Sequence, residues 1–127
     1  MKQTTLRTIL AAAVIAAAVP QARAGWGTRF TVGVTNTQAW GETNAARHSD
    51  DDVQRIGCGV THDKVAEKTQ VKCLARNSDS EVLSCTSYDV DFVPLIASIG
   101  DYAYIAFTCQ GPNLVKLQVD KYSNSLP

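Results

Sequence analysis

Apolar and polar residues alternate along most of the chain, and this period of two is typical of half-buried β-strands. The clearest segment is 102–109, in which every second side chain is apolar. The alternation recurs in five other segments: 30–37, 56–61, 71–75, 82–87 and 114–122. In the last of these, Val115, Leu117 and Val119 are predicted to share the apolar face. The pattern therefore predicts about six strands.

Residues 89–100 follow the helical period instead. The apolar residues are spaced as on one face of a helix: Phe92, Leu95, Ile96 and Ile99. Asp89 or Asp91 could cap the start of this helix. If Asp91 is the N-cap, Pro94 occupies the third helical position, where a missing N–H removes no helical hydrogen bond. Gly100 suits the end of the helix. We predict one short helix within residues 90–99.

Turn-forming residues separate the predicted strands at 63–64, 78–80 and 111–113, which favours antiparallel hairpins. Residues 38–54 are polar without a clear period and are predicted to form a long loop. Strands and helices do not alternate as they would in a parallel sheet. The predicted fold is therefore mainly β: a compact antiparallel β-sandwich or partly closed barrel of about six strands with one short helix.

The N-terminal segment has the order of a secretory signal peptide. Two basic residues without an acid precede an apolar run over 9–19, and Ala22-Arg23-Ala24 places small side chains at a cleavage site. The run is about a dozen residues, whereas a membrane span needs about 20. We predict that residues 1–24 are a signal peptide and that 25–127 form a single disulfide-stabilised β domain, secreted or periplasmic and not inserted in a membrane after cleavage.

Export determines the interpretation of the cysteines: Cys58, Cys73, Cys85 and Cys109. In an oxidising compartment an even number indicates disulfides, and the spacings do not match a zinc site or a redox motif. If 78–80 form a hairpin turn, Cys73 and Cys85 face each other. This favours Cys73–Cys85 with Cys58–Cys109, and the main alternative is Cys58–Cys73 with Cys85–Cys109.

Charge limits the classes of partner. The chain has 12 basic and 12 acidic residues, but Lys2, Arg7 and Arg23 lie in the predicted signal peptide. The exported part would then have nine basic and twelve acidic residues, a net charge of about −3 with each side chain counted as a full charge. A clustered basic patch is absent, so nucleic acid is not an expected partner.

The sequence offers little for catalysis or metal binding. His48 precedes the acidic run Asp50–Asp52, but the spaced ligands of a calcium loop are missing, and a solvated loop is favoured. His62 and Asp63 are adjacent on a predicted strand, so their side chains would point to opposite faces. Motifs of common hydrolases and phosphate loops do not occur. We expect no cofactor and no metal.

Aromatic residues among polar neighbours favour binding instead. Trp40 lies in the predicted loop among hydrogen-bonding side chains, as a recognition anchor would, or it folds over the sheet as a lid. Tyr102 and Tyr104 share the face opposite the apolar one and form either a binding strip or the cover of a second layer. The candidate binding residues are Trp40, Asn44, Arg47, His48, Tyr102 and Tyr104.

These observations favour an exported, small, non-catalytic binding protein. Its partner would be an extracellular or periplasmic protein or a glycan, and an inhibitor of an external enzyme fits the same pattern. A small secreted hydrolase and a purely structural envelope protein are the alternatives. A hydrolase needs a positioned nucleophile, base and orienting group, and neither histidine has a convincing neighbour in the sequence.

Overall fold

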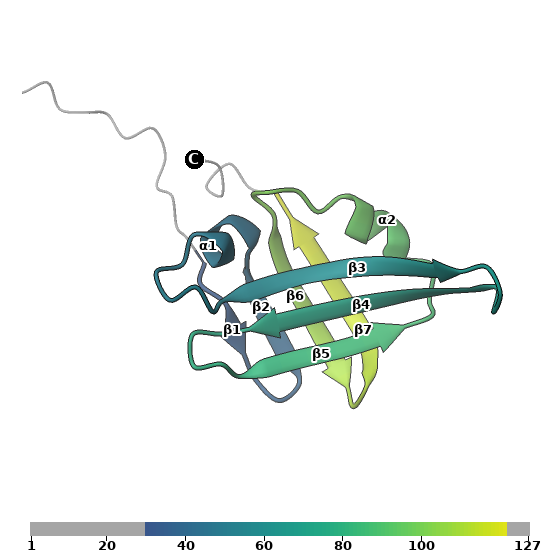
Figure 1. Cartoon of the computed structure of the whole chain (residues 1–127), viewed down its shortest axis with the longest axis horizontal. Coiled ribbons are helices and arrows are strands. Elements are labelled where there is room, and N and C mark those ends of the chain that lie inside the picture. Colours follow the sequence, from purple (N-terminus) through teal and green to yellow (C-terminus); the bar gives the residue numbers. More distant parts are fainter. Residues whose placement is uncertain (1–29, 122–127) are drawn as a thin grey trace, which may run out of the picture.

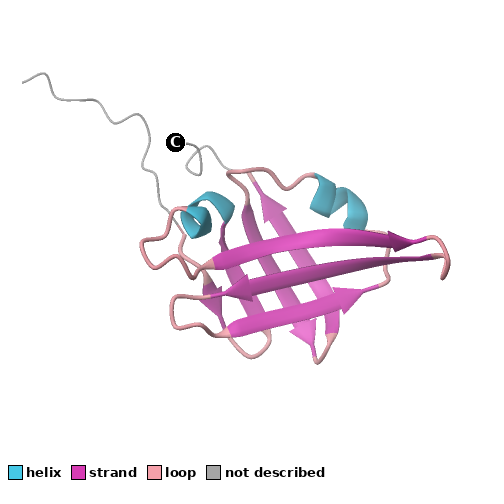
Figure 2. Cartoon of the chain, viewed as in Figure 1, coloured by secondary structure: helices cyan, strands magenta, loops and turns pink. Residues whose placement is uncertain are grey.

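The computed structural model describes residues 30–121, so the predicted signal peptide lies outside the described residues (Figures 1 and 2). This part of the chain folds into seven strands and two short helices. The strands are β1 (Gly33–Val34), β2 (Gln38–Glu42), β3 (Arg55–Asp63), β4 (Lys68–Arg76), β5 (Val82–Ser87), β6 (Tyr104–Gln110) and β7 (Asn113–Asp120), and the helices are α1 (Thr43–Arg47) and α2 (Phe92–Ala97). The prediction of a mainly β fold is confirmed.

All seven strands belong to one sheet in the order β1-β2-β6-β7-β5-β4-β3. Neighbouring strands are antiparallel except β5 and β7, which run parallel and pair only at Thr86 and Asn113. The sheet is therefore mainly antiparallel, as predicted, with one short parallel contact between β5 and β7 that the sequence did not indicate. Because the β5–β7 pairing is so short, the sheet changes direction there. Figure 1 shows β3, β4 and β5 crossing in front of β2, β6 and β7.

The hydrophobic core lies between these two crossing parts of the sheet. Ile105 and Phe107 of β6 are the largest apolar side chains that are fully buried. Most of the other core residues come from both parts of the sheet: Ala39, Val71, Cys73, Ala75, Cys85, Cys109, Leu114 and Leu117. Val32, before β1, and Ala46, on α1, complete the core. Their alternation along the strands matches the period of two seen in the sequence.

The loop predicted over residues 38–54 is in fact partly regular. Residues 38–42 form β2, which pairs with β6 along its whole length, and residues 43–47 form α1. The inward positions of β2 are Ala39 and Gly41, both buried. Side chains this small give no hydrophobic alternation, so pairing with β6 and not local pattern determines this strand.

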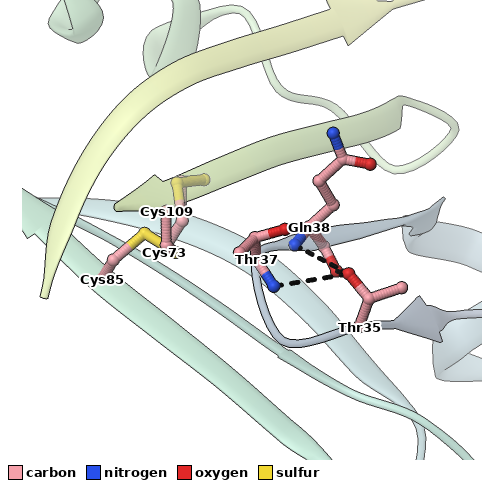
Figure 3. The surroundings of a disulfide bond; sticks show 7 residues. Thr35, Thr37, Gln38, Cys73, Cys85 and Cys109 are labelled. Atoms are coloured by element: carbon pink, nitrogen blue, oxygen red, sulfur yellow. Dashed lines mark hydrogen bonds between the residues drawn. A yellow bond between two sulfur atoms is a disulfide. The ribbon is translucent and has the colours of Figure 1, made fainter. Parts of the chain in front are cut away.

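The strand predicted over residues 30–37 is much shorter. Only Gly33 and Val34 pair with β2, and the chain then turns back at Thr35. The Thr35 hydroxyl accepts hydrogen bonds from the backbone N–H of Thr37 and of Gln38, at 3.4 and 3.0 Å (Figure 3). This local turn competes with the extended strand and ends it.

A β-bulge changes which residues of β7 face the core. The register with β6 shifts between Thr108 and Cys109, and Val115 is the extra residue on β7. Leu114 and Leu117 are buried as a result, whereas Val115 is 44% exposed. The prediction that Val115 shares the apolar face was therefore wrong, because an inserted residue reverses the alternation on one side of it.

The helix predicted within residues 90–99 is confirmed as α2. Asp91 is the N-cap residue, so Pro94 occupies the third helical position, as expected. The Asp91 side chain makes no capping hydrogen bond, whereas the carboxylate of Asp89, the other candidate, accepts one from the Asp91 N–H at 2.9 Å. Phe92, Val93 and Ile96 pack against the core.

The two disulfides are Cys58–Cys73 and Cys85–Cys109, so the favoured pairing was wrong and the alternative is correct. Cys73 does lie directly opposite Cys85, but it also lies opposite Cys58 on its other side. The Cα atoms of Cys58 and Cys73 are 4.1 Å apart, the spacing of a pair without backbone hydrogen bonds, in which side chains are closest. Cys73 then forms the wider, hydrogen-bonded type of pair with Cys85.

Cys85 instead reaches across the core to Cys109, with a Cα–Cα distance of 5.9 Å. This bond joins β5 in one crossing part of the sheet to β6 in the other. The β1–β2 turn lies beside this bond (Figure 3). The Cys109 N–H donates to the Thr37 carbonyl at 2.8 Å and so ties the turn to β6.

Candidate functional site

Trp40 lies on the outer face of the sheet, on the side away from the core. The strand register aligns it with Ala106 on β6 and, through Ala106, with Gln118 on β7. Gln38, Thr108 and Lys116 form the next row across the same three strands. Since alternate residues of a strand share a face, the structure brings these polar side chains to the same surface as the indole.

This surface is hollowed by a cavity of about 210 Å³, which we call the outer-face hollow. Ala106 has the smallest side chain of the first row and lies between Trp40 and Gln118. The outer-face hollow is lined by Gln38, Trp40, Tyr104, Ala106, Thr108, Lys116 and Gln118, with contributions from Ala39 and Phe107. Five of these residues supply hydrogen-bonding side chains other than the indole, so the hollow combines an aromatic wall with polar groups.

Gly33 fixes the position of the Trp40 side chain. The two residues are opposite each other in the β1–β2 pairing, and a Cβ at position 33 would lie 2.3 Å from the indole Cε2 atom. The indole therefore rests on the bare backbone of Gly33, a close approach that only glycine permits. Trp40 remains 36% exposed, so one part of the ring is packed and the rest is available at the rim of the hollow.

Tyr104 is the second aromatic residue of the hollow. Its ring makes an edge-to-face contact with Phe30, with ring centroids 5.4 Å apart. Burial and, secondarily, the negative charge of Asp120 raise the pKa of the Tyr104 hydroxyl, so the group stays protonated and can donate a hydrogen bond at neutral pH. Tyr102 lies before β6 begins and does not line this hollow.

The other predicted binding residues lie on α1 or directly after it, away from the outer-face hollow. Arg47 borders a second cavity of about 390 Å³ between α1, the start of β3 and residues 99–101, which we call the α1 hollow. It forms an ion pair with Asp101 at 3.4 Å, and both side chains are exposed. Asn44 and His48 line neither hollow. The six predicted residues are thus divided, and Trp40 and Tyr104 alone share a hollow.

The outer-face hollow and the surroundings of α1 also contain residues that were not among the predicted binding residues. Thr43 connects α1 to the chain before β6, since its hydroxyl donates to backbone carbonyls, with the Asp101 oxygen nearest at 2.7 Å. Gln38, Thr108, Lys116 and Gln118 line the outer-face hollow. The signal for Lys116 and Gln118 was present, because they alternate with the buried or half-buried Leu117 and Val119. The sequence did not show that β7 lies two strands from Trp40.

The acidic run at Asp50–Asp52 is organised as a turn. Asp51 accepts hydrogen bonds from the Gln54 side chain at 2.7 Å and from the backbone N–H of Val53 at 2.9 Å. These bonds, the Gln54 side chain first, lower the pKa of the Asp51 carboxyl to about 2. Gln54 in turn accepts from the Val32 N–H at 2.9 Å, which ties this turn to the start of the sheet. No group of three or more metal-ligating side chains occurs within residues 30–121.

The Asp51 turn is expected to weaken in acid. A carboxyl whose pKa is lower in the folded than in the unfolded chain stabilises the fold above its unfolded pKa, and this contribution is lost as pH falls from about 4 to about 2. We expect the amide resonances of Val53 and Gln54 to titrate in NMR spectra with a midpoint near pH 2. Asp51→Asn should abolish this titration, and a midpoint near 4 would contradict the hydrogen-bonded arrangement.

The histidines do not form a catalytic pair in this structure. The His62 Nδ1 atom contacts the Thr69 hydroxyl at 2.8 Å, across the β3–β4 pairing. The Asp63 carboxylate accepts from the backbone N–H of Val65 and of Ala66 and so holds the hairpin turn. His48 is exposed at the end of α1. Neither histidine lines either hollow.

Comparisons with protein-family models, curated proteins and solved structures found no match to this chain. The two helices of the described part of the chain, α1 and α2, are far too short to cross a bilayer. The two disulfides fit a protein that resides in an oxidising environment.

Proposed function

We propose that this chain is an exported, non-catalytic binding protein whose outer-face hollow recognises a glycan. One observation carries the proposal: a part-exposed tryptophan stands beside a concave surface lined by polar side chains. The face of an indole offers a flat apolar surface to the C–H groups of a sugar ring. Gln38, Thr108 and Gln118 provide donors and acceptors for sugar hydroxyls at the level of the strands.

The size and openness of the hollow favour one ring of a longer chain. Its volume of about 210 Å³ is below the range of roughly 300–1,000 Å³ typical of cavities that enclose a small molecule. A polysaccharide that lies across the surface needs only one such hollow for each sugar ring that binds. Lys116 lines the same hollow and adds a positive charge, which suits a sugar that bears a carboxylate.

The site is held in place before a ligand arrives. Trp40 and the polar side chains come from paired strands, and Gly33 limits the movement of the indole. A preorganised side chain loses less conformational entropy on binding, so more of the contact energy contributes to affinity. This rigidity supports recognition by a preformed surface and not by a loop that folds around its ligand.

Export is part of the proposal and rests on two features. Residues 1–24 have the order of a secretory signal peptide, and both disulfides require an oxidising compartment to persist. The hydrolase alternative has weaker support, because both histidines are engaged or placed outside the two hollows.

Replacing Trp40 by alanine should weaken glycan binding by about tenfold or more, as expected for a central aromatic contact. The measurement is isothermal titration of the mature protein with soluble peptidoglycan fragments and with chito- and cello-oligosaccharides. Tyr88→Ala is the matched control, since Tyr88 is also an exposed aromatic residue, at 62%, but lies outside the hollow. Its affinity should equal that of the wild type.

A second variant tests the position of the indole without removing it. Gly33→Ala places a methyl group where the Trp40 ring now lies, so the ring must move and affinity should fall while Trp40 is still present. If Trp40→Ala lowers stability but leaves the affinity for every bound glycan unchanged, Trp40 only covers Gly33 and the proposed site is wrong. Binding of a secreted protein, with no affinity for any of these glycans, would replace the glycan by a protein partner.

A further inference from the structure

Strand β3 forms a long outer edge of the sheet. It has nine residues and pairs without interruption with β4, whereas the other edge, β1, has two residues. Natural edge strands are usually short or are protected by lysine, proline or a bulge. β3 contains no lysine or proline, and its charges lie toward its ends. Within residues 30–121, no strand pairs with its outer side.

The outward backbone groups of β3 follow from the ladder with β4. Cys58 and Cys73 are opposed at a Cα–Cα distance of 4.1 Å, which marks a pair without mutual backbone hydrogen bonds. The N–H and C=O groups of Cys58 therefore point away from β4, and by alternation so do those of Ile56, Val60 and His62. These groups form no backbone hydrogen bond elsewhere in the described part of the chain.

The two halves of β3 have different surroundings. Residues 59–68, which include the turn into β4, are all exposed, and Figure 1 shows this end of the hairpin projecting beyond the rest of the fold. The other half, from Arg55 to Cys58, borders the α1 hollow. In an antiparallel pair of identical strands, the projecting half of each copy lies beside the hollowed half of the other.

We propose that two copies of this chain pair through antiparallel β3 strands, with Gly59 opposite Gly59 of the partner subunit. This interface does not depend on the proposed glycan site. In this register Ile56 lies opposite His62 of the partner subunit, and Cys58 lies opposite Val60 of the partner subunit. All of these residues carry outward backbone groups, so the hydrogen bonds of the new ladder are complete, and the two sheets join into one.

The side chains of β3 also favour this register. Arg55 lies opposite Asp63 of the partner subunit, and the twofold symmetry repeats this opposite-charge pair. Both residues share the face on which directly opposed side chains are closest, where such pairs are favourable. On the other face, Val60 is 42% exposed in the single chain and would cover the region of Cys58 in the partner. A shift of register by two residues would lose the charge pairing.

Cysteine substitution provides a sharp test of the register. Gly59→Cys should link two copies under mild oxidation, because residue 59 faces its own counterpart and a Cβ there meets no other atom within 4 Å. Gly57→Cys is the matched control: its Cβ is equally unobstructed, but Thr61 of the partner subunit lies opposite. Non-reducing electrophoresis and mass mapping of the linked peptides identify the bond, and the wild type should sediment at twice the monomer mass.

Removing the charge should weaken the pair. Asp63→Asn keeps an oxygen to accept from the Val65 and Ala66 N–H groups, so the turn is preserved, but both charge pairs are lost. We expect the dissociation constant of the dimer to rise roughly threefold to tenfold at low salt. Asp79→Asn, in the β4–β5 turn, should have no effect. A monomeric wild type, or equal linking by Gly57→Cys and Gly59→Cys, would overturn the proposal.

Discussion

Replacing both Cys85 and Cys109 by alanine is expected to lower the free energy of unfolding by about 3–5 kcal/mol. This bond closes a segment with a sequence separation of 24 and joins two strands that are not neighbours in the sheet. Its loss frees the unfolded chain and removes a link between the crossing parts of the sheet, where β5 and β7 pair at one position only. Equilibrium denaturation by urea, with the double variant beside the wild type, measures the change.

The matched control is Cys58→Ala with Cys73→Ala. That bond has a separation of 15 and lies within a hairpin whose strands already pair over nine positions. Its removal should cost less, about 2–3 kcal/mol. If the Cys58–Cys73 variant is the less stable of the two, the link across the core is not the main contribution of the disulfides.

Replacing Phe107 by alanine is expected to cost about 3–5 kcal/mol, the usual range for a fully buried phenylalanine. Phe107 is 1% exposed in the middle of β6, between the two crossing parts of the sheet. Deleting its ring removes contacts with both parts and leaves a cavity that paired strands cannot close. A domain of this size has a total stability of only about 5–15 kcal/mol, so the variant should unfold near ordinary growth temperatures.

Val115→Ala is the control for Phe107→Ala. Val115 lies on the neighbouring strand but is 44% exposed because of the bulge, so its truncation should change stability by less than about 0.5 kcal/mol. Thermal unfolding followed by circular dichroism compares the two variants. Similar losses in both would mean that the bulge does not turn Val115 away from the core.

A change in the core should also affect the outer-face hollow. Phe107 lies between Ala106 and Thr108, which both line that hollow, and it contributes to the lining itself. Loss of the ring should therefore loosen β6 beneath Trp40 and Tyr104. Controls for folding are needed whenever a variant of β6 is tested for glycan binding.

The sequence by itself determined the elements whose side chains alternate strongly. Ile105 and Phe107 mark β6, Val71 and Cys73 mark β4, and the helical spacing of Phe92 and Ile96 marks α2. In these segments the local pattern and the burial agree, because the same apolar face that gives the pattern is the face that packs. The even number of cysteines likewise determined that two disulfides form, and the predicted hairpin register, with Cys73 opposite Cys85, was correct.

Only the tertiary structure decided the features that depend on a partner far along the chain. β2 has small inward residues and is a strand because β6 lies beside it, and this pairing places Trp40 on a sheet and not in a loop. The disulfide pairing depended on which neighbour of Cys73 is opposed without backbone hydrogen bonds, a property of the ladder that spacing in the sequence does not reveal. The same cause explains the bulge at Val115 and the position of Lys116 and Gln118 beside Trp40. Long-range pairing determines the register of each strand, and the register determines on which face every side chain lies.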